Sequence, residues 1–183
     1  VLCLFDKADD AESMQELVYA SLPNLPNQAE KLGEQMVVTT DAEFVKYCER
    51  LLLASTELPI DEIVSEAEAR SGIAIPAHVD RRGYGLYGVL GFIPEGVNLP
   101  AVEISRRSTE QKARQQHPDL EGRAVITSSD AHMLADIGSC RTVFQLEHRS
   151  VQEIKLAFER LDGRCVEECR TVGGGYSSAD SES

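Results

Sequence analysis

The residues of this chain best suited to chemistry follow the apolar stretch 125–127, in the sequence VITSSDAH. Asp130 and His132 stand one residue apart just after this predicted strand. If the backbone stays extended there, side chains at positions i and i+2 point to the same side. A carboxylate oxygen beside an imidazole nitrogen suits a divalent transition metal. The alternative is a polar turn, in which Asp130 bonds its own backbone and His132 lies at the surface.

A second group of polar residues follows another apolar stretch. Residues 73–81, IAIPAHVDR, predict a buried strand that ends near His78 and Arg81. His78, Asp130 and His132 therefore all stand at or just beyond the carboxyl ends of predicted strands. Ligands gather at such strand ends in α/β folds. The shared position predicts a metal site formed by these three residues.

Further polar residues near this edge have both a functional and a structural interpretation. Glu103, in the predicted strand 101–105, could hydrogen-bond a ligand histidine or form a salt bridge with an arginine. Arg81 could hold a phosphate through paired hydrogen bonds, or it could belong to a solvated loop. Both are candidate substrate-binding residues. Asp136 is expected to cap a turn before Gly138 rather than bind metal.

The elements that must position these residues alternate from residue 58 to residue 164. Apolar strands follow predicted helices, and Ser108 and Ser150 are expected to cap two of the helices, Ser150 in a capping box with Glu153. This alternation is typical of parallel strands covered by helices, in an open α/β sheet or a β/α barrel. The common glycine-rich nucleotide-binding motifs do not occur in the sequence.

Residues 1–57 carry no recognisable chemistry. Asp9 and Asp10 are expected to begin a helix of about a dozen residues. The segment 21–57 is interpreted as an insertion or lid. Within it, residues 41–54 fit either a helix or, in part, the second strand of a hairpin.

Composition narrows the classes of partner. The formal net charge of −13 repels phosphate backbones at long range, so no extended nucleic-acid-binding face is expected. A membrane span and a signal peptide are not visible, which favours a cytoplasmic location. The oligomeric state stays open. The five cysteines are expected to be reduced thiols rather than metal ligands; they are Cys3, Cys48, Cys140, Cys165 and Cys169.

Three segments together resemble the PHP (polymerase and histidinol phosphatase) family. They are PAHVDR at residues 76–81, LPAVEIS at 99–105 and SSDAHMLADIG at 128–138, and VLCLF at 1–5 resembles the family's mid-domain strand. The resemblance implies a distorted β/α barrel whose top binds two or three divalent ions, commonly zinc, manganese or iron. His78 matches the histidine ligand of the family's third motif, and Asp130 and His132 match the two ligands of the fourth.

The resemblance also implies a function. Members of this family are metal-dependent phosphoesterases that hydrolyse phosphomonoesters or phosphodiesters, which implies that Asp130 and His132 are catalytic. The substrate could be a small phosphorylated metabolite, a nucleotide or an oligonucleotide end, and the acidic net charge favours the small ones. The family's H-x-H and T-D-H motifs would stand before residues 1–5 and are not in this sequence. Residues 1–171 are therefore interpreted as a C-terminal portion of the domain, weakly active or inactive alone, and residues 172–183 as a flexible tail. One alternative is a non-catalytic PHP remnant that serves structure or partner binding. Another is a hydrolase that uses the same metals on a non-phosphate ester or amide.

Overall fold

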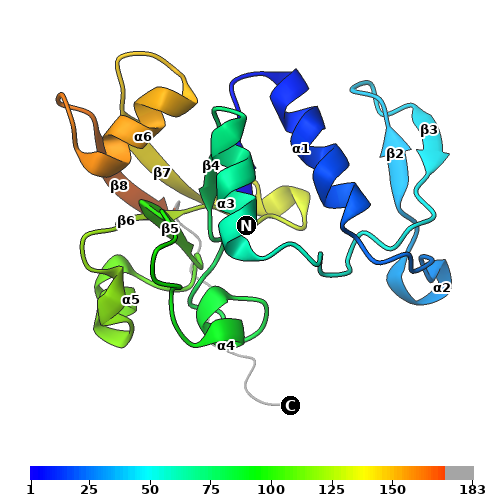
Figure 1. Ribbon diagram of the computed structural model, residues 1–183, viewed down its shortest axis with the longest axis horizontal. Helices are drawn as coiled ribbons and strands as arrows, with labels where there is room; N and C mark the ends of the chain where they lie inside the picture. The colour runs from blue at the N-terminus through cyan, green and yellow to red at the C-terminus, as the bar shows by residue number, and fades with distance from the viewer. Residues whose placement is uncertain (172–183) are drawn as a thin grey trace.

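The computed structural model describes residues 1–171, and the predicted flexible tail lies outside them. Helices and strands alternate from α3 to α6, as the sequence predicts (Figure 1). The elements are β1 (Leu2–Leu4), α1 (Ala8–Ala20), α2 (Ala29–Leu32), β2 (Met36–Val38), β3 (Phe44–Tyr47), α3 (Ile60–Ala69), β4 (Ile73–Ile75), α4 (Leu86–Leu90), β5 (Ala101–Ile104), α5 (Glu110–Gln116), the 3-10 helix η1 (Pro118–Leu120), β6 (Ala124–Thr127), the 3-10 helix η2 (Leu134–Asp136), β7 (Cys140–Gln145), α6 (Val151–Glu159) and β8 (Cys165–Thr171).

Parallel strands form the centre of the β-structure. β5 and β6 are parallel, with Glu103 opposite Ile126. The chain leaving β4 runs beside β5, because Glu103 N donates to Pro76 O and Val79 N donates to Glu103 O, both at 2.9 Å. These two bonds follow the parallel pattern with one residue too many, and His78 lies in the resulting bulge. The carboxyl ends of β4, β5 and β6 therefore share one edge.

The outer strands are antiparallel, and the expected barrel is not confirmed. β1 pairs with β4, and β7 pairs with β8. β6 and β7 are joined through the Thr142 hydroxyl, which accepts from Thr127 N at 2.9 Å and donates to Thr127 O at 2.8 Å. Within residues 1–171 the ladders form two-stranded sheets and no closed barrel. A barrel requires each strand to pair on both sides, which these short strands do not do.

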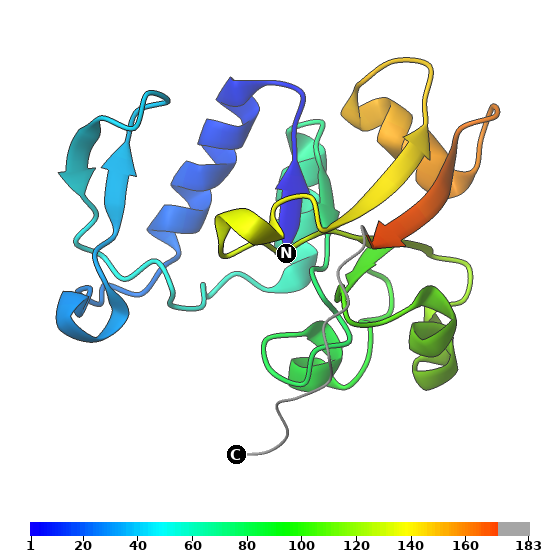
Figure 2. The ribbon, with the colours of Figure 1, turned by 180° about the vertical axis from the view of Figure 1, so that it is seen from behind.

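The buried strands separate two hydrophobic cores. Side chains alternate along a strand, so Ala74 packs against the α3 side while Ile73 and Ile75 pack against the α6 side. Val64 of α3 belongs to the first core, and Phe158 of α6 belongs to the second. Helices therefore cover both faces of the central strands (Figure 2). This packing fixes the direction in which each strand presents its carboxyl end.

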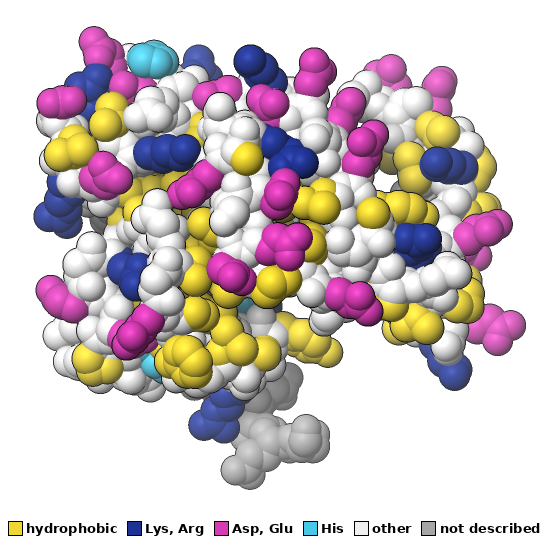
Figure 3. All heavy atoms as spheres, viewed as in Figure 1, with side chains coloured by type: hydrophobic (Ala, Val, Ile, Leu, Met, Phe, Trp, Pro, Cys, Tyr) yellow, Lys and Arg dark blue, Asp and Glu magenta, His cyan; other side chains and the backbone are white. Residues whose placement is uncertain are grey.

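The segment 21–57 forms α2 and a β2–β3 hairpin. In both ribbon views α1 lies between this segment and the strands β4, β5, β6, β7 and β8. Residues 44–47 form the second strand of that hairpin, which decides between the two expectations for this stretch. The hairpin residues are exposed, including Met36 and Phe44, and Figure 3 shows hydrophobic side chains over it. Its role as an insertion or lid stays a prediction.

The start of α6 is confirmed at Ser150, with a difference in the capping box. Ser150 Oγ accepts a hydrogen bond from Glu153 N at 3.1 Å. The Glu153 carboxylate does not accept the hydrogen bond from Ser150 N that completes a capping box. It accepts instead from Glu147 N at 2.8 Å and from Arg164 Nε at 2.9 Å. Glu153 is buried, and an arginine and a backbone N–H compete successfully for it.

The starts of α5 and α1 differ from expectation. α5 begins one residue later than predicted, because Thr109 rather than Ser108 accepts from Lys112 N, at 3.3 Å. α1 begins at Ala8 without a side-chain cap, and Asp9 and Asp10 lie in its first turn, where their charge favours the helix dipole. Among the helices of residues 1–171, none is long and apolar enough to span a membrane.

Candidate metal centre

His78, Glu103 and Asp130 come from three neighbouring strand ends. His78 follows β4, Glu103 is in β5, and Asp130 follows β6 (Figure 1). Val79 N bonds Glu103 O, which holds the His78 loop against β5. From the same loop, Arg81 Nη2 reaches Asp130 Oδ2 at 2.7 Å. The structure thus brings these sequence-predicted residues to one edge.

Both candidate ligands at this edge have a left-handed backbone. The φ angle is 34° at His78 and 45° at Asp130. Such angles are uncommon for residues other than glycine and persist where the surroundings hold them, often at functional sites. Gly85 allows the close packing that holds His78, because a Cβ at Gly85 would lie 2.8 Å from His78 O and 2.4 Å from Arg81 O. The close packing of the loop after β4 therefore requires a glycine at position 85.

Asp80 fastens the same loop to the end of β5. Its Oδ1 accepts from Ser105 N at 2.7 Å, and its Oδ2 accepts from Ser105 Oγ at 3.0 Å. Asp80 and Ser105 are both half-buried. The loop is thus not freely solvated, which was the alternative expectation for the loop that contains Arg81. It is tied at Asp80 and packed at Gly85.

Two ligand-type atoms at the edge have no hydrogen-bond partner among the described residues. They are His78 Nδ1 and Asp130 Oδ2, and both are buried. Buried polar atoms are nearly always partnered in proteins. Arg81 approaches Asp130 Oδ2 closely, but the contact is not aligned as a hydrogen bond. An imidazole nitrogen and a carboxylate oxygen left in this way fit a divalent cation.

His132 is oriented by its neighbour. Its side chain is exposed, and its Nδ1 lies 2.8 Å from Asp130 O. When Nδ1 donates to that carbonyl, Nε2 carries the free lone pair. Ligating histidines commonly donate their second N–H to a backbone carbonyl in this manner. The arrangement suits His132 to metal binding through Nε2.

Glu103 is the most enclosed polar residue of the edge, with 2% of its surface exposed. Its carboxyl hydrogen-bonds Ser128 and lies near His78 and Asp130. Burial raises the pKa of Glu103, while Ser128 and His78 act in the opposite direction. Such burial favours a role in positioning His78 over direct substrate contact. Ser128 was not among the residues predicted for the site, although its place between β6 and Asp130 put it at the same edge.

A second group of possible metal ligands lies outside this edge. In the described part of the chain, the ligand atoms of Glu147, His148 and Glu153 are the group that lies within 4.8 Å of one another. His78, Asp130 and His132 do not reach this proximity. Both glutamates of the trio, however, form ion pairs with Arg164. Arg164 thus already occupies both carboxylates and offsets part of their charge, and among the described residues they leave no buried atom without a hydrogen-bond partner.

Asp136 differs from its predicted role as a turn cap. It is 8% exposed and forms an ion pair with Arg106, with Oδ1 3.1 Å from Nη1 and Oδ2 3.3 Å from Nη2. This pair joins η2 to the loop after β5, across 30 residues of sequence. The loop that follows His132 is therefore anchored at Asp136.

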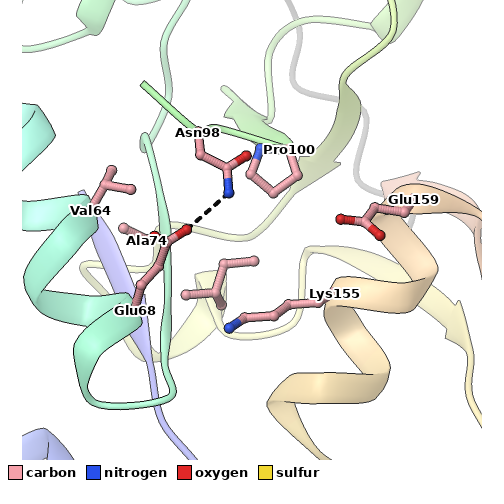
Figure 4. Close-up of a pocket in the computed structure, with 8 residues that line it drawn as sticks. Val64, Glu68, Ala74, Asn98, Pro100, Lys155 and Glu159 are labelled. Carbon is pink, nitrogen blue, oxygen red and sulfur yellow. Dashed lines mark hydrogen bonds between the residues drawn. The ribbon is translucent and has the colours of Figure 1, made fainter. Parts of the chain in front are cut away.

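A separate hollow lies at the opposite, amino ends of β4 and β5. It has a volume of about 210 Å³, and within it Asn98 Nδ2 donates to Glu68 Oε1 at 2.9 Å (Figure 4). Its lining contains none of the sequence-predicted site residues; it is formed by Val64, Glu68, Ile73, Ala74, Asn98, Pro100, Lys155 and Glu159. The hollow is distinct from the candidate centre.

Residues 120–160 match the family described as PHP-associated. The resemblance to the PHP family is confirmed. The matched segment contains β6, Asp130, His132 and β7. No curated protein matches the sequence.

Two solved structures are similar to this chain in fold. The lesion-specific endonuclease PfuEndoQ from Pyrococcus furiosus is 15% identical, with a TM-score of 0.67 over 91% of this chain and 37% of the other. Endonuclease Q in complex with a 27-mer duplex carrying an abasic lesion at the active site is 17% identical, with a TM-score of 0.59 over 90% and 37%. This chain thus spans a little over a third of the length of each. At these identities, the likeness establishes a shared α/β fold.

Proposed function

We propose that the edge formed by β4, β5 and β6 is part of the catalytic centre of a metal-dependent phosphoesterase. The proposal rests chiefly on one observation: His78 Nδ1 and Asp130 Oδ2 are buried, lack hydrogen-bond partners among the described residues, and belong to adjacent strand ends. Arg81 offsets the charge of Asp130 from 2.7 Å, but a buried carboxylate oxygen and a buried imidazole nitrogen that both lack a hydrogen bond are costly, and a divalent ion would satisfy both. The match of residues 120–160 to a PHP-associated family supports the same chemistry.

Each residue has a distinct role in this proposal. His78, Asp130 and His132 would hold divalent ions of the zinc, manganese or iron class. Such ions would supply Lewis acidity, which makes water a better nucleophile and offsets charge on phosphate oxygens. Asp130 would also orient that water. Arg81 would donate to the non-bridging phosphate oxygens, and Glu103 would keep His78 in position.

The substrate class that we favour is the phosphodiester of a polynucleotide rather than a small phosphorylated metabolite. Arg81 and Arg82 stand in the loop after β4, and Arg107 stands in the loop after β5 beside Arg106, which is paired with Asp136. Arginines match phosphate oxygens in geometry and charge. The similar fold of an endonuclease seen with a DNA duplex supports this choice over the small substrate expected from net charge.

Metal binding is the first test. The full 183-residue chain, freed of metal with chelator, is titrated with Mn²⁺ and Zn²⁺ by calorimetry. His78→Ala and Asp130→Asn should weaken binding about 10- to 100-fold, because removing even residues that support a ligand typically costs that much. His148→Ala is the matched control, since it removes an exposed histidine of the other cluster. Dependence on His148 rather than His78 would move the site to Glu147 and Glu153 and overturn the proposal.

Hydrolysis is the second test. End-labelled DNA duplexes with and without an abasic site, and p-nitrophenyl phosphate as a small monoester, are incubated with the metal-loaded chain. Cleavage that Asp130→Asn abolishes supports the phosphoesterase. If the chain is instead a non-catalytic PHP remnant, His78→Ala and Asp130→Asn should leave the results of the binding and hydrolysis assays unchanged. A hydrolase of another ester or amide predicts turnover that inorganic phosphate does not inhibit.

A further inference from the structure

Arg81 makes the contact with Asp130 that bears most directly on metal binding. Its Nη2 lies 2.7 Å from Asp130 Oδ2, the buried oxygen that lacks a hydrogen-bond partner among the described residues. The contact is thus an approach of opposite charges without the alignment of a hydrogen bond. Divalent ions of this class bind carboxylate oxygens at about 2.0–2.2 Å. The guanidinium and an ion approaching from the same direction therefore compete for one oxygen.

Arg106, a second arginine at the edge, forms a more extensive and more buried ion pair than Arg81 does. Arg106 contacts both oxygens of Asp136, and Asp136 is 8% exposed. The Arg81 pair makes one close contact, and its side chains are 43% and 29% exposed. Half-exposed single contacts contribute little to stability and are easily exchanged. Arg81 is thus held loosely enough to move, whereas Arg106 is fixed.

The loop geometry keeps Arg81 close when its side chain is released. Arg81 N donates to His78 O at 3.0 Å, and a Cβ at Gly85 would meet Arg81 O, so the backbone of Arg81 is tied directly to the loop that carries His78. A released guanidinium therefore stays within reach of the centre. Its nearest anionic partner would then be a substrate phosphate.

We infer that Arg81 is a built-in counter-cation of the candidate centre, which neutralises Asp130 until a divalent ion binds and then turns to the substrate phosphate. The inference rests on the proposed function, because it requires Asp130 to be a metal ligand. Arginine and metal compete for Asp130, so by linkage each weakens the other's hold by the same factor. Arg81 is in this sense a positioning residue that tunes metal affinity.

The test compares Mn²⁺ affinity in the full chain and in Arg81→Gln, measured by calorimetry. Arg81→Gln should bind Mn²⁺ about two- to fivefold more tightly, since it removes a competing half-exposed ion pair. Arg82→Gln, the exposed neighbour, is the matched control and should bind as the unaltered chain does. Arg81→Lys keeps the charge and should lie nearer the unaltered chain than Arg81→Gln does.

Thermal unfolding gives a readout that does not depend on activity. In chelator, Arg81→Gln should unfold at a lower temperature than the unaltered chain, because Asp130 has lost its counter-charge. At saturating Mn²⁺ the deficit should vanish or reverse, because the ion binds the folded variant more tightly. A deficit of the same size under both conditions would mean that Arg81 has only a structural role.

Each outcome decides between the two proposals. Equal or weaker Mn²⁺ binding by Arg81→Gln overturns the counter-cation inference and leaves the metal centre standing. Binding by Arg81→Lys as tight as by Arg81→Gln also overturns it, because the effect would then come from bulk and not charge. If neither the unaltered chain nor Arg81→Gln binds Mn²⁺, both the inference and the proposed centre are wrong.

Discussion

The loop that carries His78 depends on Asp80. Replacing Asp80 with alanine removes two hydrogen bonds, to Ser105 N at 2.7 Å and to Ser105 Oγ at 3.0 Å. Hydrogen bonds to charged groups contribute about 1.5–3 kcal/mol each, and the lower part of that range applies because both residues are half-buried. Asp80→Ala should therefore lower the free energy of unfolding by about 3–4 kcal/mol.

Urea unfolding followed by circular dichroism measures this loss. The midpoint should fall while the m-value stays unchanged, since the surface exposed on unfolding is the same. Asp41→Ala removes an exposed carboxylate of the hairpin loop and should stay within about 0.5 kcal/mol of the unaltered chain. Ser105→Ala removes just the hydroxyl bond and should cost about 0.5–1.5 kcal/mol.

The double variant of Asp80 and Ser105 separates this contact from general damage. If the two side chains act through each other, Asp80→Ala with Ser105→Ala should cost no more than Asp80→Ala alone. Additive losses would show that Asp80 stabilises the loop by other means. A loss below about 0.5 kcal/mol for Asp80→Ala would refute the reasoning from these two bonds altogether.

Two further predictions concern the helix starts and the carboxyl-terminal ion pair. Thr109→Ala should cost about 1 kcal/mol in urea unfolding and Ser108→Ala much less, because Thr109 caps α5; equal losses would place the cap elsewhere. Arg164 lowers the pKa of Glu153 from 4.5 to about 2, so the ionised carboxylate favours the folded state. The stability that Glu153 adds over Glu153→Gln should be complete above about pH 4.5 and decline as the pH falls toward 2. A difference that does not change with pH would contradict this.

The shared edge was predictable from the sequence because it depends on short-range patterns. Apolar runs mark the buried strands, and a polar residue just beyond each run must lie where that strand ends. His78 and Asp130 were found in this way. Their positions were predicted from adjacent residues in the sequence, without any knowledge of distant contacts.

The contacts that shape the site were not predictable, because they join distant segments. Asp80 and Ser105 are 25 residues apart, and Arg106 and Asp136 are 30 apart. The sequence therefore predicted a local turn cap at Asp136, whereas in the structure Arg106 from another loop pairs with it. The antiparallel pairing of β1 with β4 was missed for the same reason, since an apolar strand carries no mark of its direction.

Net charge and the proposed polynucleotide substrate point in different directions, and the range of each charge effect explains why both can hold. A total of −13 describes the field at a distance, and salt screens that field within roughly 8 Å at physiological ionic strength. If the proposed function is correct, a phosphate at the edge would be held at contact by Arg81, with Arg82 and Arg107 as further cations in the loops after β4 and β5. The acidic surface would slow the approach of a polyanion, and these arginines would hold the phosphate after it arrives. Under this proposal the net charge bears on the rate of association, and the local arginines bear on whether a phosphate is bound at all.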